Sequence, residues 1–428
     1  MTAVAAVLAD QRRVVGEAAV LYLDLHANPE LSGAEERTAG RFAGWLERDG
    51  LRVARGVGGH GVLAELRNGP GPTVLLRAEL DALPVAEETG LRYASTATAT
   101  GPDGRPTPVM HACGHDLHLA ALAGAARLLS ANRQHWRGTL LLAGQPAEET
   151  LTGAQAMLAD GLLDRFGRPD VALAQHTAPL LAGMVAHGSG GAVTAAGAML
   201  EVIVPGRGGH AATPHLTIDP VVTAAAIVLR LQAIIAREVP AAEQAVLSVT
   251  ELRAGGGHNL VPDQATLSVT IRALHPATLA RVTAAAERVI RAECAASGGD
   301  RPAGVRVVAQ SPANLPDAGV TAAVRAAHTD LFGAARIIAW PPSMATEDFG
   351  HLAAAGVATG YWMLGSIGPR QWAAAPGDTP AGKLAALPAN HSPAYAPDLA
   401  HTLPTGVAAL VAAALAHLAP AAPAEGPP

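Results

Sequence analysis

Residues 138–150 read GTLLLAGQPAEET, an apolar run that is closed by a proline and two glutamates. The run has the length of a strand that is buried on both faces. Similar runs occupy 73–80 and 170–179, and a helical pattern covers 116–130. Strands that alternate with helices indicate a sheet with a substantial parallel part that is covered by helices. The expected fold class is therefore α/β.

A second pattern occupies residues 188–311. Its elements are expected in the order strand, helix, strand, strand, helix, strand, at 198–206, 219–237, 245–252, 265–274, 276–294 and 304–310. This β-α-β-β-α-β order is ferredoxin-like. Because strand and helix patterns resume at 361–366 and 405–417, the unit is expected to be an insertion. The predicted domains are a catalytic domain in two parts (1–187 and 312–418), the inserted domain (188–311) and a disordered tail (419–428).

The composition limits the classes of function. The chain has 428 residues, of which 50% are hydrophobic and 15% are charged, and its net charge is -6. This balance gives no attraction for nucleic acid or an anionic membrane, so small molecules are the expected partners. The apolar segment GVAALVAAALAHLA (406–419) is expected to be too short to span a bilayer. The first residues have no basic region ahead of an apolar segment, such as a signal peptide would have. The chain has two cysteines, Cys113 and Cys294, and no disulfide framework, so a cytoplasmic location is expected.

Ionisable side chains gather where the predicted strands end. Glu79 and Asp81 close the strand at 73–80, Glu148 and Glu149 follow the strand at 138–146, and His176 closes the strand at 170–179. Ligands of open α/β sheets bind at the carboxyl ends of strands. Taken singly, a histidine after a strand is more often a hydrogen-bonded core residue, and a pair of glutamates is more often a solvated helix start.

The segment HACGHDLH (111–118) places three histidines, a cysteine and an aspartate within eight positions. It does not have the separated ligand pairs of a structural zinc finger. Together with the acids at the strand ends, it predicts a metal site with a general base, because the like-charged neighbours would otherwise repel one another. Cys113 is then expected to be a thiolate ligand and not the disulfide partner of Cys294.

Eight motifs in order give the chain a family resemblance. They are RAELDALP (77–84), MHACGHD (110–116), GQPAEET (144–150), QHTAP (175–179), GRGGHAATPH (206–215), HNLVPD (258–263), TEDFG (346–350) and NHSP (390–393). From about Leu21 to Leu418 the chain resembles the dinuclear metallopeptidases that include aminoacylase. Within them it is most similar to the amidohydrolase branch of hippurate hydrolases and auxin-conjugate hydrolases.

The resemblance implies two divalent ions, which could be Mn, Zn, Co or Ni. The implied metal ligands are Cys113, His115, Glu149, His176 and His391. Glu148 is implied as the general base and proton shuttle, and Asp81 as the acid that orients a ligand.

The resemblance also implies that the inserted domain is a lid through which two copies form a homodimer. His210 would reach the site of the neighbouring subunit and stabilise the oxyanion, although GRGGH alone would be read as a tight turn. Asn259 and Arg272 would contact the substrate carboxylate, and Arg272 could equally be a surface ion-pair former. The branch usually has Asp in place of Glu79 and Gly in place of Leu117, and the loop before Met110 is longer than usual.

The expected function is metal-dependent hydrolysis of the amide bond of N-acyl amino acids, such as hippurate or N-acetyl amino acids. A water held by the metals would attack the carbonyl carbon, and Glu148 would remove its proton. One alternative is a dipeptidase or aminopeptidase-like enzyme that acts on peptides. A second is a catalytically silent metal-containing protein that binds amino-acid conjugates. A third assigns the strand-end residues a structural role and predicts no metal.

Overall fold

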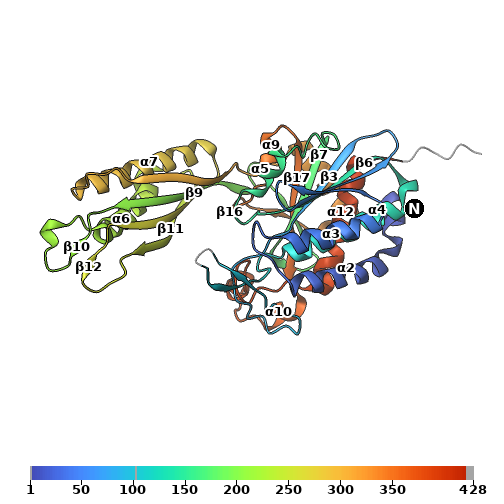
Figure 1. Cartoon of the computed structure of the whole chain (residues 1–428). Helices are drawn as coiled ribbons and strands as arrows, with labels where there is room; N and C mark the ends of the chain where they lie inside the picture. The colour runs from blue at the N-terminus through green and yellow to red at the C-terminus, as the bar shows by residue number, and fades with distance from the viewer. Residues whose placement is uncertain (1, 102–103, 421–428) are drawn as a thin grey trace, which may run out of the picture. The chain divides into compact units, whose positions relative to one another are not determined.

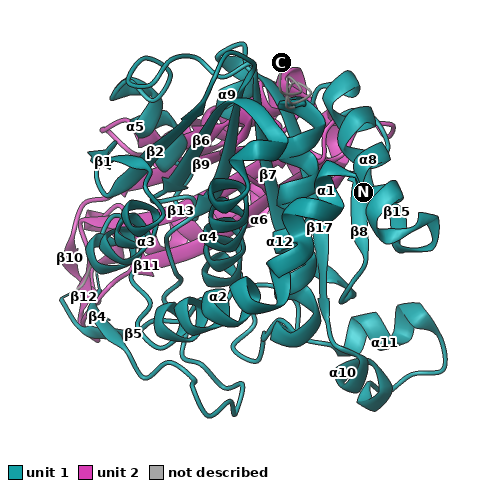
Figure 2. Cartoon of the chain, turned by 90° about the vertical axis from the view of Figure 1, so that its right-hand side faces the viewer, with its two compact units in different colours: residues 1–191, 316–341, 351–428 teal, residues 192–315, 342–350 magenta. Residues whose placement is uncertain are grey.

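The computed structural model describes residues 2–101 and 104–420. The chain divides into two compact units, which Figures 1 and 2 show. The first unit comprises 1–191, 316–341 and 351–428, and the second comprises 192–315 and 342–350. The second unit thus takes in 342–350, which the sequence analysis assigned to the catalytic domain. The other domain boundaries that the sequence predicts remain predictions.

The first unit is built on a nine-stranded sheet in the order β1-β2-β6-β3-β7-β17-β8-β15, with β18 beside β6. The strands are β1 (Arg52–Val57), β2 (Gly61–Asn68), β3 (Thr73–Glu79), β6 (Trp136–Gln145), β7 (Val171–Leu181), β8 (Val185–Gly188), β15 (Ile337–Trp340), β17 (Ala358–Ile367) and β18 (Ala419–Pro420). The neighbours β6, β3, β7 and β17 run parallel, while β1, β2 and β8 pair antiparallel with their inner neighbours. The predicted α/β class with a largely parallel sheet is confirmed.

Four long helices pack together against this sheet, as Figure 1 shows: α2 (Gln11–His26), α3 (Glu36–Arg48), α4 (His115–Ala131) and α12 (Leu399–His417). Helix α4 is buried along almost its whole length because α2, α12 and β3 surround it. Its small residues permit this packing, since a Cβ on Gly124 would lie 2.9 Å from a methyl carbon of Val407. The shorter helices are α1 (Ala3–Val7), α5 (Gly153–Ala159), α8 (Ala318–Phe332), α9 (Gly350–Ala354), α10 (Pro369–Ala374) and α11 (Pro380–Ala386).

The structure differs from the sequence-based expectation at both ends of the chain. The spacing of Val and Leu over residues 3–25 predicts one helix there, but a 3₁₀ turn at Leu8–Asp10 separates α1 from α2. The tail expected from residue 419 begins with strand β18, whose Ala419 and Pro420 pair with Arg137 and Trp136. The rest of that tail, 421–428, lies outside the described residues.

The second unit has the predicted ferredoxin-like order. Its elements are β9 (Thr194–Pro205), α6 (Pro220–Glu238), β11 (Ala245–Ala254), β13 (Gln264–Ala273), α7 (Pro276–Ala296) and β14 (Gly304–Ser311). The antiparallel sheet has the order β11-β13-β9-β14, and β16 (Ser343–Thr346) pairs with β9. Burial alternates along β13, because one face of the sheet packs against α6 and α7 while the other is polar. The predicted β-α-β-β-α-β arrangement is confirmed.

Two of the described helices, α6 and α12, are long and apolar enough to cross a membrane by length and composition. Each has 19 residues, so the expectation that the segment near 406–419 is too short is wrong. Burial gives a different account of α12, because 61% of its apolar window is buried within the protein against α4, α2 and α8. Helix α6 packs Ala224, Ile227 and Leu231 against the sheet of the second unit. Helix α12 therefore has the packing of a core helix, whereas only 33% of the apolar window of α6 is buried.

Candidate metal centre

The segment HACGHDLH (111–118) leads into helix α4 and includes its first turn. Gly114 has a left-handed backbone with φ 84°, and α4 begins directly after it at His115. His115 and His118 are three positions apart in the first turn, so both project from the same side of the helix. Their rings lie 5.6 Å apart, and the ring of His176 lies 5.8 Å from His115 and 4.6 Å from His118. The first turn of α4 thus brings two imidazoles to a third on β7.

His176 lies inside β7 and not at its end, because the strand continues to Leu181. The expectation that this histidine follows the strand is wrong, but its placement beside the cluster agrees with the prediction. Its Nε2 lies 3.5 Å from Cys113 Sγ, and its Nδ1 lies 2.8 Å from the carbonyl oxygen of Thr177. If Nδ1 carries the proton and donates it to that carbonyl, then Nε2, which faces the thiol, is the unprotonated nitrogen. Burial lowers the pKa of His176 well below its usual value, which favours the neutral form that binds metals.

Asp81 lies at the centre of the hydrogen bonds around the cluster. Its Oδ2 accepts from the backbone N–H of Glu149 at 2.9 Å and from the hydroxyl of Ser32 at 2.7 Å. Its Oδ1 lies 3.2 Å from Nδ1 of His115. Asp81 therefore fixes the backbone of one predicted ligand and the ring of another, as the orienting role requires.

Glu148 and Glu149 lie in the turn that follows β6. Nε2 of His115 is 3.8 Å from one carboxylate oxygen of each glutamate. Nε2 of His115 and Oε1 of Glu149 are both buried, and the nearest partner of Oε1 is Nε2 of His391 at 3.4 Å, a contact that does not have good hydrogen-bond geometry. A buried nitrogen and a buried carboxylate oxygen that face each other without donors between them fit a shared cation.

His391 reaches the same place from the segment between α11 and α12. Its backbone is left-handed with φ 71°, and its N–H donates to the carbonyl oxygen of Ala112 at 2.8 Å. Its Nε2 lies 3.4 Å from Oε1 of Glu149. Hydrogen bonds with Cys113 and Glu149 raise the pKa of His391 to about 10. The raised pKa reflects a surplus of negative charge, which a divalent cation would also neutralise.

His176 belongs to a donor group with Glu79, His115 and His118, whose ligand atoms lie within 4.8 Å of one another. The other predicted ligands, with Glu148, form two overlapping groups of the same kind. One contains Cys113, Glu149 and His391, and the other contains His115, Glu148 and Glu149. Glu149 belongs to both groups, so it would be a ligand that the two groups share if each held an ion. Mixed thiolate, imidazole and carboxylate donors suit Zn, Mn, Co or Ni. All five predicted metal ligands and Glu148 therefore converge in the first unit.

His118 and Glu79 form a further part of the cluster whose role the sequence did not assign. Glu79 ion-pairs with Arg77, and its other oxygen lies 2.8 Å from Nδ1 of His118. Nε2 of His118 accepts the backbone N–H of Thr177 at 2.9 Å. Burial alone raises the pKa of Glu79, but the charges of Arg77 and His118 outweigh it and hold that pKa well below its usual range. Glu79 is thus a buried anion that fixes His118 beside the backbone of His176.

The structure explains two other features in which the sequence differs from the family pattern, Leu117 and the loop before Met110. Leu117 is fully buried in the core of the first unit. The long loop before Met110 folds into a hairpin of β4 (Thr98–Thr100) and β5 (Pro106–Pro108). Residues 106–108, expected to be loop, are therefore a short strand.

Three predicted site residues belong to the second unit. Nδ1 of His210 accepts the backbone N–H of Ala212 at 3.0 Å, and its Nε2 lies 3.0 Å from the side-chain amide of Asn259. The atom of Asn259 that faces Nε2 is its amide nitrogen, so both ring nitrogens face N–H donors and a neutral ring can accept only one of the two hydrogen bonds. Arg272 donates to the carbonyl oxygen of Met344 at 3.1 Å. The roles of His210, Asn259 and Arg272 at the cluster stay predictions.

Sequence reasoning missed Ser32 and Glu35, which lie between α2 and α3 and contact the cluster from the side. Ser32 bonds Asp81, and Glu35 accepts the N–H of Ala147 at 2.8 Å. The segment PELSGAE (29–35) has no helical or strand period, so its only local signal is two acids and a serine between two predicted helices. Nothing in the sequence indicates that it meets residues more than a hundred positions away.

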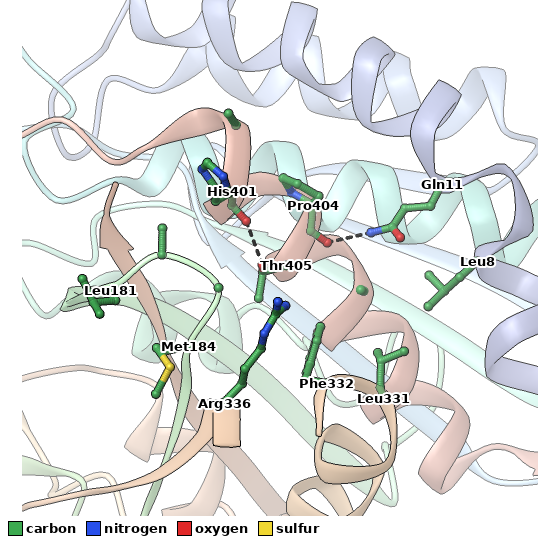
Figure 3. Close-up of a pocket in the computed structure, with 14 residues that line it drawn as sticks. Leu8, Gln11, Leu181, Met184, Leu331, Phe332, Arg336, His401, Pro404 and Thr405 are labelled. Atoms are coloured by element: carbon green, nitrogen blue, oxygen red, sulfur yellow. Dashed lines mark hydrogen bonds between the residues drawn. The ribbon is translucent and has the colours of Figure 1, made fainter. Parts of the chain in front are cut away.

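A separate cavity of about 460 Å³ lies elsewhere in the first unit. Figure 3 shows Phe332, Leu331 and Met184 among its walls, with Arg336 and Gln11 as polar lining residues. Gln11 donates to the carbonyl oxygen of Pro404 at 2.7 Å. None of the predicted site residues lines this cavity. The metal cluster, and not this cavity, holds the chemistry that the sequence predicts.

Residues 75–388 of the chain match the family described as peptidase family M20/M25/M40. The chain belongs to this family. The predicted membership in the dinuclear metallopeptidase family is confirmed, and with it the predicted class of hydrolase. The expectation of a metal site is supported by the donor groups described above.

Family M20 relatives include enzymes that are named for N-acyl amino acids. The chain is 36% identical over 251 residues to N-acetylcysteine deacetylase of Bacillus subtilis (strain 168), covering 58% of this chain and 63% of that protein. It is 33% identical over 334 residues to IAA-amino acid hydrolase ILR1-like 2 of Arabidopsis thaliana, covering 77% of this chain and 72% of that protein. The first match thus spans less than two thirds of the relative's length.

A solved family M20 structure is similar to the whole chain. It is the Bacillus subtilis YXEP protein, described as a dinuclear metal binding peptidase, with 26% identity and a TM-score of 0.68. The similarity covers 95% of this chain and 99% of that one. The shared fold extends over both units.

Proposed function

We propose that the protein hydrolyses the amide bond of N-acyl amino acids with two divalent metal ions as cofactors. The observation that carries this proposal is the pair of donor groups that share Glu149 and include Glu148. The relatives named N-acetylcysteine deacetylase and IAA-amino acid hydrolase support the class of substrate. The proposed ligands are Cys113, His115, Glu149, His176 and His391, and the metal is proposed to be Mn, Zn, Co or Ni.

Divalent ions at such a site supply Lewis acidity, which lowers the pKa of a water and polarises a carbonyl group. Glu148, only 5% exposed, is placed next to His115 and Glu149 to accept a proton from the attacking water. The same carboxyl group then delivers that proton to the leaving nitrogen when the C–N bond breaks. The products are a carboxylic acid and a free amino acid. No acyl-enzyme is needed, because water is the nucleophile.

Residues of the second unit complete the proposed mechanism. Nε2–H of His210 would donate to the oxyanion in the site of a partner subunit, an interaction that is commonly worth about 3 to 4 kcal/mol. The amide nitrogen of Asn259 lies 3.0 Å from that nitrogen, so it would have to move aside for this donation, and Asn259 would then contact the substrate carboxylate. Arg272 would bind the carboxylate of the amino-acid part of the substrate.

We further propose a homodimer that forms through the second unit. Helix α6 exposes Val222 and Leu229 at 66% and 76%, and it packs beside β11, the edge strand of the sheet. An apolar helix face next to an open strand edge is a surface that a second copy of the same unit can cover. A cytoplasmic location is proposed because Cys113 and Cys294 are both free, and a thiolate ligand must stay reduced.

The test of the function is a Glu148→Gln variant assayed with hippurate, N-acetyl amino acids and dipeptides after loading with Mn, Zn, Co or Ni. The variant should keep its metal, measured by elemental analysis, and lose amidase activity by about 100-fold or more, because the amide cannot accept the water proton. A variant that keeps both its metal and its full rate would contradict the assignment. Faster turnover of dipeptides than of N-acyl amino acids would favour a peptidase, and wild-type protein with metal but no hydrolysis would favour a binding protein.

A further inference from the structure

The turn that carries Glu148 and Glu149 has an unusual backbone. Ala147 and Leu151 have φ values of 50° and 56°, which place two non-glycine residues in the left-handed region. Such residues are strained, and they persist only where the surrounding structure holds them. Hydrogen bonds from Thr152 and Gly153 to the carbonyl oxygen of Ala147 close the turn. The two glutamates are therefore presented by a strained loop.

Glu35 holds this strained turn from outside. Its Oε1 accepts the N–H of Ala147 at 2.8 Å and the N–H of Gly33 at 2.8 Å. The side chain is fully buried, and its Oε2 has no hydrogen-bond partner within the described chain. Burial raises the pKa of Glu35 even though the backbone N–H groups that it accepts act in the opposite direction. Burial of a carboxyl group is unfavourable unless hydrogen bonds compensate for the lost water, and here the two backbone N–H groups supply those bonds.

The segment around Glu35 contacts the other side of the cluster as well. Ser32 donates to Oδ2 of Asp81 at 2.7 Å, and the same oxygen accepts the N–H of Glu149. The backbone of Glu30 accepts the N–H of Ala82 at 2.8 Å, so the segment is tied to the strand end that carries Asp81. The N–H groups of Ala147 and Glu149, on either side of Glu148, are thus each held by a carboxylate.

We propose that Glu35 is a positioning residue, which fixes the left-handed turn at Ala147 and so orients Glu148 and Glu149 for metal and water. The proposal rests on the proposed function, because it assigns those two glutamates their roles. Glu35 itself contacts neither substrate nor metal. Glu35 acts on the turn through its hydrogen bond with the backbone N–H of Ala147.

The first test measures the affinity for Zn²⁺ alone, by competition with a chromophoric chelator and without substrate. Glu35→Ala removes the acceptor, so affinity should fall by about 10- to 100-fold, the usual effect of losing a group that orients a ligand. At saturating metal kcat should fall by about 10-fold or more with little change in KM, because the substrate contacts remain. Glu35→Gln keeps an acceptor oxygen of the same reach and should stay within about threefold of the wild type in both measurements.

The second test is a rescue at the strained residue. Glycine adopts a positive φ without steric cost, so Ala147→Gly should relieve the need for the external acceptor. The double variant with Glu35→Ala should therefore bind Zn²⁺ at least about fivefold more tightly than Glu35→Ala alone. The matched control is Glu30→Ala, in the same segment, whose carboxylate accepts the N–H groups of Arg37 and Thr38 at the start of α3. It should lower the melting temperature and leave Zn²⁺ affinity unchanged.

Wild-type affinity in Glu35→Ala, equal losses in Glu35→Gln and Glu35→Ala, or no rescue by Ala147→Gly would each overturn the proposal. If Glu35→Ala does not fold, Glu35→Asp takes its place, because it keeps a carboxylate but withdraws the acceptor by one methylene. Undiminished affinity in Glu35→Asp would then contradict the proposal. The metal measurement needs no turnover, so it remains decisive even if the Glu148→Gln assay rejects the proposed activity.

Discussion

At the scale of single residues, Asp81 shows how one buried carboxylate orders a site. It accepts three hydrogen bonds, from the Ser32 hydroxyl, the backbone of Glu149 and the ring of His115. Burial raises the pKa of Asp81, but the bond with His115 and the other donors outweigh it and lower that pKa. Asp81 is therefore an acceptor for every partner, and a donor at this position would be mismatched.

Asp81→Asn tests this account. One of the two oxygens becomes an NH₂ group, which must face either the ring of His115 or the hydroxyl of Ser32 and the N–H of Glu149. Zn²⁺ affinity should fall by about 10- to 100-fold. The control is Asp300→Asn, whose carboxylate is 61% exposed and ion-pairs with Arg207 in the second unit. If Asp81→Asn binds Zn²⁺ as tightly as the control, the orienting role is wrong.

At the scale of elements, α8 and β8 meet through a buried pair of histidines. Nε2 of His328 lies 3.0 Å from the carbonyl oxygen of Ala409, so it donates. Nδ1 of His328 then accepts from Nε2–H of His187 at 3.1 Å. Burial lowers the pKa of His187 to about 3 and that of His328 to about 4. The contact between the two elements needs both rings to be neutral.

Stability should therefore fall in acid. The unfolded histidines take up protons near pH 6.5 while the folded ones resist until about pH 3 to 4, so the stabilisation present above pH 6.5 is lost as the pH falls. Each histidine should contribute a slope of about 1.4 kcal/mol per pH unit in the free energy of unfolding. Urea unfolding of chelator-treated protein between pH 7 and pH 5 measures the slope. His187→Gln should lower this slope by about 1.4 kcal/mol per pH unit, the contribution of one histidine. An unchanged slope would contradict the account of the neutral histidine pair.

At the scale of the whole molecule, the first unit carries the metal cluster, and the second carries the apolar helix face and His210. The proposed metal binding and the proposed dimer contact therefore involve different units, so variants can test them separately. A metal that binds only the folded state stabilises it by about 2.7 kcal/mol at a free concentration of 100 times Kd.

The assembly prediction uses α6. Sedimentation velocity should find the wild type as a dimer and Leu229→Glu as a monomer, because the substitution buries a charge in the proposed interface. Gln134→Glu adds the same charge at an exposed position of the first unit, away from α6, and should remain dimeric. A dimeric Leu229→Glu protein or a monomeric wild type would contradict the proposed interface.

The metal prediction uses the melting temperature. Removing metal with a chelator should lower the melting temperature of the wild type, and adding Zn²⁺ or Mn²⁺ should restore it. Cys113→Ser replaces the thiolate and should reduce the restored shift. Equal melting temperatures with and without metal would argue that the cluster binds no ion.

The sequence by itself determined the local features of this protein. Strand and helix periods depend on near neighbours, so the parallel strands, the β-α-β-β-α-β order and the start of α4 at HACGHDLH could be predicted. The types of ligand were also readable, since Cys113, His115, Glu148 and Glu149 lie within two short motifs.

Only the tertiary structure decided what depends on contacts between distant segments. It brought His391 to Glu149, and it joined Glu35 to Ala147 across 112 positions. It also made α12 a buried helix, because α4, α2 and α8 surround it. Such contacts follow from strand register and helix packing in three dimensions, and residue spacing along the chain does not carry that information.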